Sequence, residues 1–519
     1  MPKLSIDHRE VEVPQGATIL DAARKLDIDV PTLCHLDGHP ANTSCLVCMV
    51  KIRQSGKLVP ACGAPAEDGM EVESETDEVH AVRRQALELL LSDHLGDCLA
   101  PCWFGCPANM DIPLMLRQIA RRDFAGAIET VKRDIALPAV LGRICPAPCE
   151  KTCRRTQADG AVAICLLKRL VADVDLAASQ PYVPECAPAS GKRVAIVGAG
   201  PTGLAAAYYL ARRGHACVLF DENPTPGGRL LRETSEEELP REVLQAEAET
   251  ILRLGIELRA GTRVANDPSP ADVQREFDAV LLALGAQAPE QAEAWGVKTQ
   301  RRGIGIDGAT YATGVDGLFA AGAAVRGKCM VIRSAADGKE AAAAIDQYLR
   351  GEPVTGIPRP LNVRMGRLQA DEIDVFLAAA NRAGRREPSG GTQAGFAADE
   401  GAEQAERCLR CDCRALADCR LRHYAAVYQA DPKRHGSPQR HFVQDWTHEK
   451  VVYEPGKCIA CGLCIAITEA AGEPVGLAFR GRGFDVRVAV PMTGTLSDAL
   501  TKTAAECVAA CPTAALAWK

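Results

Sequence analysis

The sequence predicts a multidomain protein of mixed α/β and α+β class. Its 519 residues are enough for three to four domains of ordinary size. A strand, a glycine-rich turn, a helix and a second strand follow one another from residue 192, which predicts a parallel α/β domain. The 23 cysteines fall mostly in tight groups on either side of it. We therefore expect domains at residues 1–78, 79–180, 190–355 and 400–519.

The composition excludes several classes of protein. Apolar residues make up 47% and charged residues 24%, which is ordinary for a globular chain and not for a disordered or fibrous one. Acidic residues (67) outnumber basic ones (60), which disfavours nucleic-acid binding. No run approaches the roughly 18 apolar residues of a membrane span, and the first residues lack the apolar core of a signal peptide. We expect a cytoplasmic protein, in which grouped thiols stay reduced and bind metal.

The N-terminal domain is expected to bind a two-iron cluster. Short β segments surround one helix, and four cysteines are spaced so that their thiolates could wrap a [2Fe–2S] cluster. A zinc site or buried thiols is the alternative. Residues 3–100 resemble the β-grasp, ferredoxin-like domain that opens the large iron–sulfur subunit of respiratory complex I and of many iron hydrogenases. The loop reads ANTSCLVC where that family has a glycine and a basic residue. The predicted ligands are Cys34, Cys45, Cys48 and Cys62.

The second domain is expected to be helical and to hold two four-iron clusters. The complex I family would have a local cluster of one histidine and three cysteines here. However, CWFGCPANMDIP and GRICPAPCEKTC resemble the N-terminal helical domain of the glutamate synthase small subunit and of dihydropyrimidine dehydrogenase. That resemblance implies interleaved ligands. One set is His94, Cys98, Cys102 and Cys153, and the other is Cys106, Cys145, Cys149 and Cys165. His94 could instead be a polar residue at a helix end, and the family's fourth ligand is often a non-cysteine near Lys168.

The third domain carries a dinucleotide-binding signature. Gly198 permits the tight turn, and Gly200 lets backbone N–H groups approach a pyrophosphate at a helix N-terminus. Gly203 permits close packing of helix and strand, and Asp221 ends the second strand, where a carboxylate can hold a ribose hydroxyl.

This unit resembles the FAD-binding half of the glutamate synthase small subunit, and YATGVDGLFAAGAAVRGKCMVIRSAADGKEAAAAI resembles the segment that closes that domain. The family has an aspartate after AAG, whereas this chain has an alanine. A scaffold without flavin is the alternative. The resemblance implies that FAD is bound by Gly198, Gly200, Pro201, Gly203, Asp221, Glu222, Gly228, Arg229, Gly322 and Ala323.

A second nucleotide-binding unit is missing from the third domain. In the glutamate synthase small subunit, a Rossmann unit for NADPH separates the two FAD segments. Here EFDAVLLALGAQAPE runs within about ten residues into WGVKTQRRGIGIDG, whereas a βαβ unit needs about 30 residues or more. We therefore expect that this chain does not bind NAD(P)H in the way its relatives do.

The C-terminal domain contains two more cysteine groups. GKCIACGLCI lacks a local fourth cysteine, which would fall at Thr468, but ECVAACPTAAL resembles the remote Cys-Pro that closes a four-iron site of the complex I large subunit. Cys507 is a spare or an alternative ligand. This site's predicted ligands are Cys458, Cys461, Cys464 and Cys511. The group ERCLRCDCRALADC could bind a four-iron cluster or a structural zinc. Its thiols are Cys408, Cys411, Cys413 and Cys419.

Together these motifs predict FAD, one [2Fe–2S] cluster and about four [4Fe–4S] clusters. The sequence shows no Ser/His/Asp, Cys/His or paired-carboxylate arrangement for substrate chemistry. We therefore expect an electron-transfer subunit of a multisubunit oxidoreductase. The resemblances imply docking with a complex-I-like NADH-oxidising flavoprotein and with a catalytic subunit such as a formate dehydrogenase or hydrogenase. The alternatives are a self-contained NAD(P)H-dependent oxidoreductase like the glutamate synthase small subunit, and a scaffold with empty sites.

Overall fold

The chain folds into two compact units, which we describe separately. The structure is a computed structural model that describes residues 1–287, 291–436 and 440–519. Unit 1 comprises residues 1–100, 360–378 and 411–519. Unit 2 comprises residues 101–359 and 379–410. The two ends of the chain therefore belong to the same unit.

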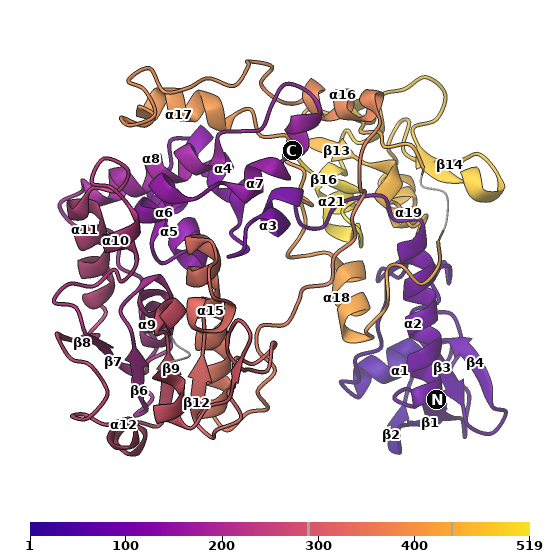
Figure 1. The fold of residues 1–519 in the computed structure, drawn as a ribbon. Helices are drawn as coiled ribbons and strands as arrows, with labels where there is room; N and C mark the ends of the chain where they lie inside the picture. The colour runs from indigo at the N-terminus through magenta and orange to yellow at the C-terminus, as the bar shows by residue number, and fades with distance from the viewer. Residues whose placement is uncertain (288–290, 437–439) are drawn as a thin grey trace. The chain divides into compact units, whose positions relative to one another are not determined.

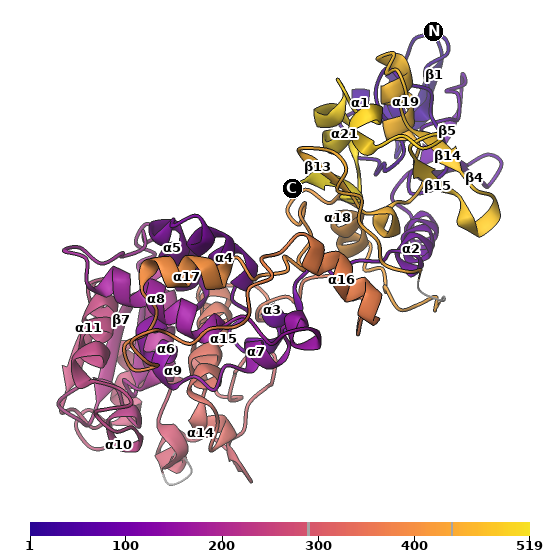
Figure 2. The same cartoon turned by 90° about the horizontal axis from the view of Figure 1, so that it is seen from above.

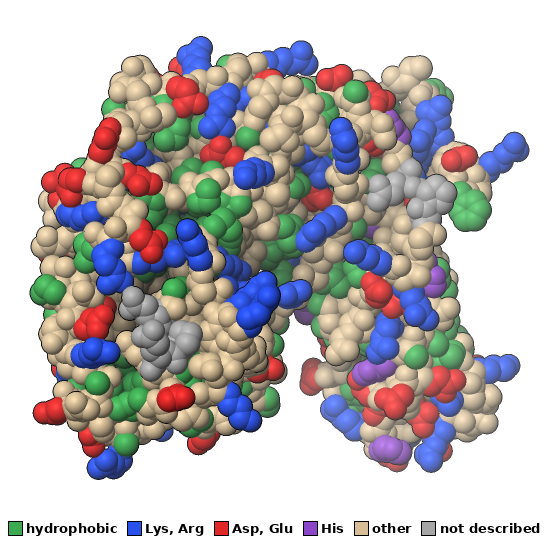
Figure 3. Space-filling model, in the orientation of Figure 1, with side chains coloured by type: hydrophobic (Ala, Val, Ile, Leu, Met, Phe, Trp, Pro, Cys, Tyr) green, Lys and Arg blue, Asp and Glu red, His purple; other side chains and the backbone are tan. Residues whose placement is uncertain are grey.

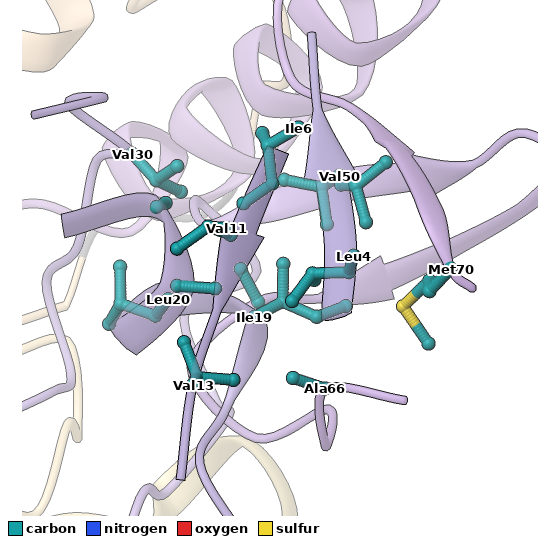
Figure 4. Close-up of a cluster of buried hydrophobic side chains, with 14 of the residues drawn as sticks. Leu4, Ile6, Val11, Val13, Ile19, Leu20, Val30, Val50, Ala66 and Met70 are labelled. Carbon is teal, nitrogen blue, oxygen red and sulfur yellow. The ribbon is translucent and has the colours of Figure 1, made fainter. Parts of the chain in front are cut away.

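Unit 1 begins with a five-stranded mixed sheet in the order β2-β1-β5-β3-β4, in which only β1 and β5 run parallel. A helix begins after Thr18, whose hydroxyl accepts the Asp21 N–H as an N-cap. Alternate strand side chains such as Leu4 and Ile6 meet this helix in an apolar core (Figure 4). The elements are β1 (Lys3–Ile6), β2 (Arg9–Glu12), α1 (Ile19–Lys25), β3 (Met49–Ile52), β4 (Lys57–Pro60) and β5 (Glu71–Glu73).

The rest of unit 1 joins helix α2 (Asp77–Ser92) to the C-terminal segments. Arg83 of α2 is fully buried and donates to the Tyr428 hydroxyl at 2.7 Å and to the Met49 carbonyl at 3.0 Å. The remaining elements are α16 (Ala370–Ala378), α18 (Arg420–Val427), β13 (Val451–Tyr453), α19 (Leu463–Ala470), β14 (Ala478–Arg480), β15 (Arg487–Ala489), α20 (Leu496–Ala499), α21 (Ala504–Ala510) and β16 (Leu516–Trp518). Strand β13 pairs with β16, so the end of the chain is fixed in this unit.

Unit 2 contains a helical region and a parallel sheet (Figures 1 and 2). The helices are α3 (Pro101–Gly105), α4 (Ile112–Ala120), α5 (Phe124–Asp134), α6 (Pro138–Ile144), α7 (Pro148–Lys151), α8 (Ile164–Leu176) and α17 (Ala398–Ala405). Short 3-10 turns lie at Arg154–Gln157, Gly285–Gln287 and Glu293–Trp295 in this unit, and at Pro455–Lys457 and Gly483–Asp485 in unit 1.

The parallel sheet of unit 2 has the order β12-β9-β6-β7-β8, so the strand order reverses at β6. Its central strands are buried on both faces, as parallel sheets usually are. Gly338 lets helix α15 approach α9, because a Cβ there would lie 2.3 Å from the Thr202 carbonyl oxygen. The elements are β6 (Arg193–Val197), α9 (Pro201–Arg212), β7 (Ala216–Asp221), α10 (Leu230–Glu233), α11 (Arg241–Leu252), β8 (Glu257–Ala260), α12 (Pro270–Glu276), β9 (Ala279–Leu282), β12 (Leu318–Ala320), α14 (Ala323–Arg326) and α15 (Val331–Leu349).

Between β9 and β12, the described residues form no second parallel sheet. The strands there are β10 (Thr299–Gln300) and β11 (Gly303–Ile304), which pair antiparallel. Among the described helices, none has both the length and the apolar character that a membrane crossing requires. Acidic and basic side chains are interspersed on the face that Figure 3 shows.

Candidate functional site

A cavity of about 860 Å³ opens at the carboxyl ends of β6, β7 and β9 in unit 2. This is the edge at which parallel sheets bind nucleotides, where the strand order reverses. Eight of the ten predicted FAD-binding residues line it, namely Gly198, Gly200, Pro201, Asp221, Glu222, Gly228, Arg229 and Ala323. The sequence did not single out Arg232, Arg263 and Lys328, which also line the cavity and supply positive charge.

Four of the glycines predicted to bind FAD form two pairs with different roles. Gly200 and Gly228 face each other, because a Cβ on Gly228 would lie only 3.0 Å from the Gly200 Cα. Gly203 and Gly322 do not line the cavity and instead permit close packing. A Cβ on Gly203 would lie 1.8 Å from the Gly198 carbonyl oxygen, and one on Gly322 would lie 2.0 Å from Thr202 Oγ1. Side chains at the first pair would fill the cavity, and side chains at the second pair would disrupt the fold.

Asp221 is held at the end of β7 by the glycine turn. Its Oδ2 accepts the Ala199 N–H at 2.6 Å, and its Oδ1 accepts the backbone and side-chain N–H groups of Asn223 at 2.8 and 2.7 Å. Each carboxylate oxygen keeps acceptor capacity for a hydroxyl of a ligand. Together with the cations around the cavity, this carboxylate fits the ribose and pyrophosphate of FAD. Ala323 supplies no carboxylate at the position where the resembling family has one.

The four N-terminal cysteines form one buried group in unit 1. They are Cys34, Cys45, Cys48 and Cys62, each at most 4% exposed. The Cys48 thiol donates to Cys62 Sγ at 3.4 Å. Hydrogen bonds from Cys45 and Cys62 lower the pKa of Cys34. The loop between α1 and β3, together with the residues just after β4, thus gathers all four thiols that the sequence predicts for the two-iron site.

The C-terminal thiols line a cavity in the same unit. The cysteines around it are Cys458, Cys461, Cys464 and Cys511. Backbone N–H groups of Ala460 and Leu516 each donate to a sulfur of this group at 3.4 Å. Cys507 is instead buried in the apolar core, and Thr468 Oγ1 donates to the Ile465 carbonyl. The structure therefore brings Cys511, rather than Cys507, to the cavity with the three local cysteines.

The N-terminal and C-terminal thiol groups lie close together. Asn42 Nδ2 donates to the Cys461 carbonyl oxygen at 2.7 Å. Cys34, Cys45 and Cys461 belong to one buried cluster of side chains. Burial raises the pKa of Cys461 to about 12, and the nearby charges of Cys511, Cys458 and Cys34 add to that rise.

A third group in unit 1 joins cysteines that the sequence assigned to different clusters. The Cys413 N–H donates to the Cys98 carbonyl at 3.1 Å. Burial raises the pKa of Cys98, and Cys413 adds to the rise. Burial also raises the pKa of Cys419 to about 12, with Cys413, Cys98 and Cys511 adding to it. The expected sets placed Cys98 with Cys102 and Cys153, and Cys413 with Cys408. This difference arises because residues 411–419 fold back onto residues 93–98, which local spacing does not reveal.

His94 shares a charged neighbour, Lys457, with this third group. Its Nδ1 atom is buried and finds no hydrogen-bond partner among the described residues. Burial and, to a smaller extent, the Lys457 cation lower the pKa of His94 to about 4, so the imidazole is neutral and able to bind metal. The Lys457 cation also counteracts the rise in the pKa of Cys98, and the charge of Cys413 raises the pKa of Lys457. The histidine and these two thiols therefore share one neighbour.

A further cysteine group lies in unit 2. A cavity there is lined by Cys106, Cys145, Cys149 and Cys165, which are the four members of one predicted set. They come from the residue after α3, the end of α6, α7 and α8. Burial raises the pKa of Cys149 to about 12, whereas a hydrogen bond from Cys165 lowers the pKa of Cys145 to about 6.

Cys153 and Cys408 are connected through two arginines in unit 2. Arg155 donates to the Arg407 carbonyl, and both guanidinium groups bind Asp159, at 2.7 and 3.0 Å. Burial lowers the pKa of Arg407, and the charge of Cys153 counteracts this fall. Arg407 directly precedes Cys408 in the chain. In the described part of the chain, no three His, Cys, Asp or Glu side chains are gathered tightly enough for a single metal ion. The thiolates of a multi-iron cluster bind different irons and so stand farther apart.

Three family models match the chain. Residues 2–77 match the "2Fe-2S iron-sulfur cluster binding domain", residues 91–180 match "dihydropyrimidine dehydrogenase domain II, 4Fe-4S cluster", and residues 168–338 match "pyridine nucleotide-disulphide oxidoreductase". The chain is built from redox domains. These matches confirm the predicted fold class and the presence of a two-iron domain, a four-iron domain and a flavoprotein-type oxidoreductase domain.

Several known proteins are similar in sequence to part of this chain. The NADPH-Fe(3+) oxidoreductase subunit beta of Geobacter sulfurreducens is 38% identical over 208 residues, which are 39% of this chain and 30% of the relative. The NADP(+)-dependent formate dehydrogenase subunit beta of Moorella thermoacetica is 37% identical over 227 residues, 40% of this chain and 32% of the relative. The glutamate synthase [NADPH] small chain of Bacillus subtilis is 32% identical over 185 residues, 35% of this chain and 37% of the relative. The matches thus span about a third of each relative, and the last confirms the resemblance inferred from the motifs.

Proposed function

We propose that this chain is the electron-transfer subunit of a cytoplasmic, multisubunit oxidoreductase. It relays electrons between a NAD(P)H-oxidising or NAD(P)H-reducing partner and a catalytic subunit such as a formate dehydrogenase or hydrogenase. The observation that carries the proposal is the unbroken series of thiol groups in unit 1. Asn42 and Cys34 connect the first group to Cys461, and Cys511 connects the second group to Cys419.

The ligand sets proposed here follow these contacts. Cys34, Cys45, Cys48 and Cys62 would hold the two-iron cluster. The four-iron clusters would be held by His94, Cys98, Cys413 and Cys419; by Cys458, Cys461, Cys464 and Cys511; and by Cys106, Cys145, Cys149 and Cys165. These sets assign no cluster to Cys102, Cys153, Cys408 and Cys411.

The chemistry of these groups suits a relay. When bound, a flavin exchanges electrons in pairs or singly, whereas iron–sulfur clusters carry one at a time. The residues around the flavin cavity would hold FAD, with Asp221 at the ribose and the turn at Gly200 at the pyrophosphate. The described residues between β9 and β12 provide no second nucleotide-binding sheet to hold a nicotinamide against the flavin. Two relatives are named as beta subunits, which supports a role within a complex.

Stopped-flow mixing of the isolated, anoxically reconstituted chain with NADH and with NADPH tests this function. We expect no flavin bleaching at catalytically useful rates until a partner subunit, purified with the chain from its native host, is added. Dithionite should bleach the flavin in the same sample, which shows that the cofactor is competent. Rapid bleaching by NADPH alone would contradict the relay and favour the self-contained reductase.

A further inference from the structure

Lys168 of helix α8 is buried without a carboxylate partner. Only 4% of it is exposed, and its Nζ donates to the Leu141 carbonyl oxygen at 3.0 Å. In the part of the chain that the structure describes, no ion pair joins its ammonium to an acidic side chain. The other two buried lysines among the described residues are paired, since Lys132 lies 2.6 Å from Asp175 and Lys457 lies 2.5 Å from Glu454.

An unpaired ammonium is costly to bury, by several kcal/mol even after relaxation. The surroundings of Lys168 show what offsets this cost. It lines the same cavity as Cys106, Cys145, Cys149 and Cys165. The cavity's other lining residues are apolar and include Met110, Ile112, Ile135, Ile164 and Ile332. The acidic groups of this lining are the four thiols, so the lysine, a cation at neutral pH, faces four sulfur atoms.

We propose that the Lys168 ammonium is the counter-charge of the four-iron cluster held by Cys106, Cys145, Cys149 and Cys165, and that it raises the midpoint potential of that cluster. The inference rests on the cluster proposed above. Four thiolates make this site negative, and each added electron makes it more so. A fixed cation in an apolar cavity stabilises the added negative charge more than water-screened charges do. A protonated ammonium has no lone pair, so Lys168 acts here as a positioning residue and not as a ligand.

The test compares four forms of the full chain, reconstituted without oxygen: wild type, Lys168→Met, Lys168→Arg and Lys151→Met. Lys151 is an exposed residue of α7, two positions after Cys149, so its loss removes the same charge on the water side of the site. The readouts are iron and sulfide content, followed by a potentiometric titration with dithionite, monitored by EPR. A Cys165→Ala variant identifies the signal of this cluster, because it should lose four irons.

We expect Lys168→Met to keep its iron and to reduce at a more negative potential. The reduction equilibrium should weaken at least tenfold, which for one electron is about 59 mV. Lys168→Arg should restore most of the shift, and Lys151→Met should match the wild type. An unchanged potential in Lys168→Met would overturn the inference, and so would the loss of four irons from both Lys168 variants, which would indicate a ligand. If the wild type lacks the EPR signal that the Cys165→Ala variant is meant to identify, the proposed cluster itself would be contradicted.

Discussion

The side chain of Asn42 connects two thiol groups that lie more than 400 residues apart in the sequence. Its Nδ2 donates to the carbonyl oxygen of Cys461 at 2.7 Å, a separation of 419 residues along the chain. Asn42 precedes Cys45 in the N-terminal loop, and Cys461 belongs to the C-terminal motif. The contact fixes the distance between the proposed two-iron cluster and the nearest four-iron cluster.

We expect Asn42→Ala to slow electron exchange between these two clusters. The variant loses one hydrogen bond, worth about 1 kcal/mol, and with it the fixed spacing of the two loops. Freeze-quench EPR of the two signals, after mixing with a limiting amount of reductant, measures the exchange. Asn381→Ala removes an amide hydrogen bond to Glu406 in unit 2 and serves as the control. Equal rates in both variants would contradict a role for this contact.

Substitutions at two glycines of the same turn, Gly200 and Gly203, should have different effects. A Cβ on Gly200 meets only the Gly228 Cα, at 3.9 Å, so Gly200→Val should fold and leave the cavity too narrow for the FAD pyrophosphate. Gly203→Ala would place its Cβ against the Gly198 carbonyl and should destabilise the domain by about 1–3 kcal/mol. Thermal unfolding and flavin content after reconstitution separate the two effects. A folded Gly200→Val with stoichiometric FAD would show that the cavity is not the flavin site.

Serine substitution should distinguish Cys507, which lies in α21, from Cys511, which directly follows that helix. Cys511→Ser removes a cavity-lining thiolate and should lose up to four irons. Cys507→Ser places a hydroxyl in the apolar core, so it should cost about 1–3 kcal/mol in the free energy of unfolding and keep all iron. Iron and acid-labile sulfide analysis measures both variants. The reverse pattern would make Cys507 the ligand.

His94 should be detectable as a nitrogen ligand. Its buried Nδ1 has no hydrogen-bond partner among the described residues, and His94 shares the neighbour Lys457 with Cys98 and Cys413. In pulsed EPR of the reduced chain, we expect a strong nitrogen coupling that disappears in His94→Cys while the iron content stays unchanged. His80→Ala changes a half-exposed histidine that pairs with Glu75, and it should keep the coupling. A coupling that survives in His94→Cys would exclude His94 as the ligand.

Glu247 should make the stability of unit 2 depend on pH. Its carboxylate accepts the Ala139 and Val140 N–H groups, at 2.7 Å each, at the start of α6. Burial raises its pKa from 4.5 to about 7. Between these two values the folded chain binds more protons than the unfolded chain, so stability is fully present below pH 4.5 and falls as the pH rises through about 7.

Replacement of Glu247 by glutamine should flatten this dependence, because the amide does not titrate. Denaturant unfolding of the variant and the wild type at pH 5 and pH 8 measures the slope, with ionic strength held constant. Glu249→Gln changes an exposed carboxylate of α11, the helix that also contains Glu247, and should leave the slope unchanged. A glutamine variant with the wild-type slope would show that another group titrates.

The sequence by itself determined the parts of this protein that depend on neighbouring residues. The turn at Gly198 and Gly200, with Asp221 at the end of the next strand, predicted a nucleotide-binding edge, and the structure has a cavity there. Covalent spacing keeps the thiols of Cys458, Cys461 and Cys464 on one loop, so their shared site was also foreseeable. Short β segments around one helix predicted a small N-terminal sheet, and the family resemblance implied its β-grasp arrangement.

Only the tertiary structure decided which distant segments meet. Local spacing grouped Cys408, Cys411, Cys413 and Cys419, yet the fold brings Cys413 and Cys419 to Cys98, more than 300 residues earlier in the chain. It likewise buried Lys168 among four thiols that come from four separate segments. Residue spacing constrains ligands within one loop, whereas contacts between remote loops depend on how apolar faces pack, and a single sequence does not encode that packing in any local pattern.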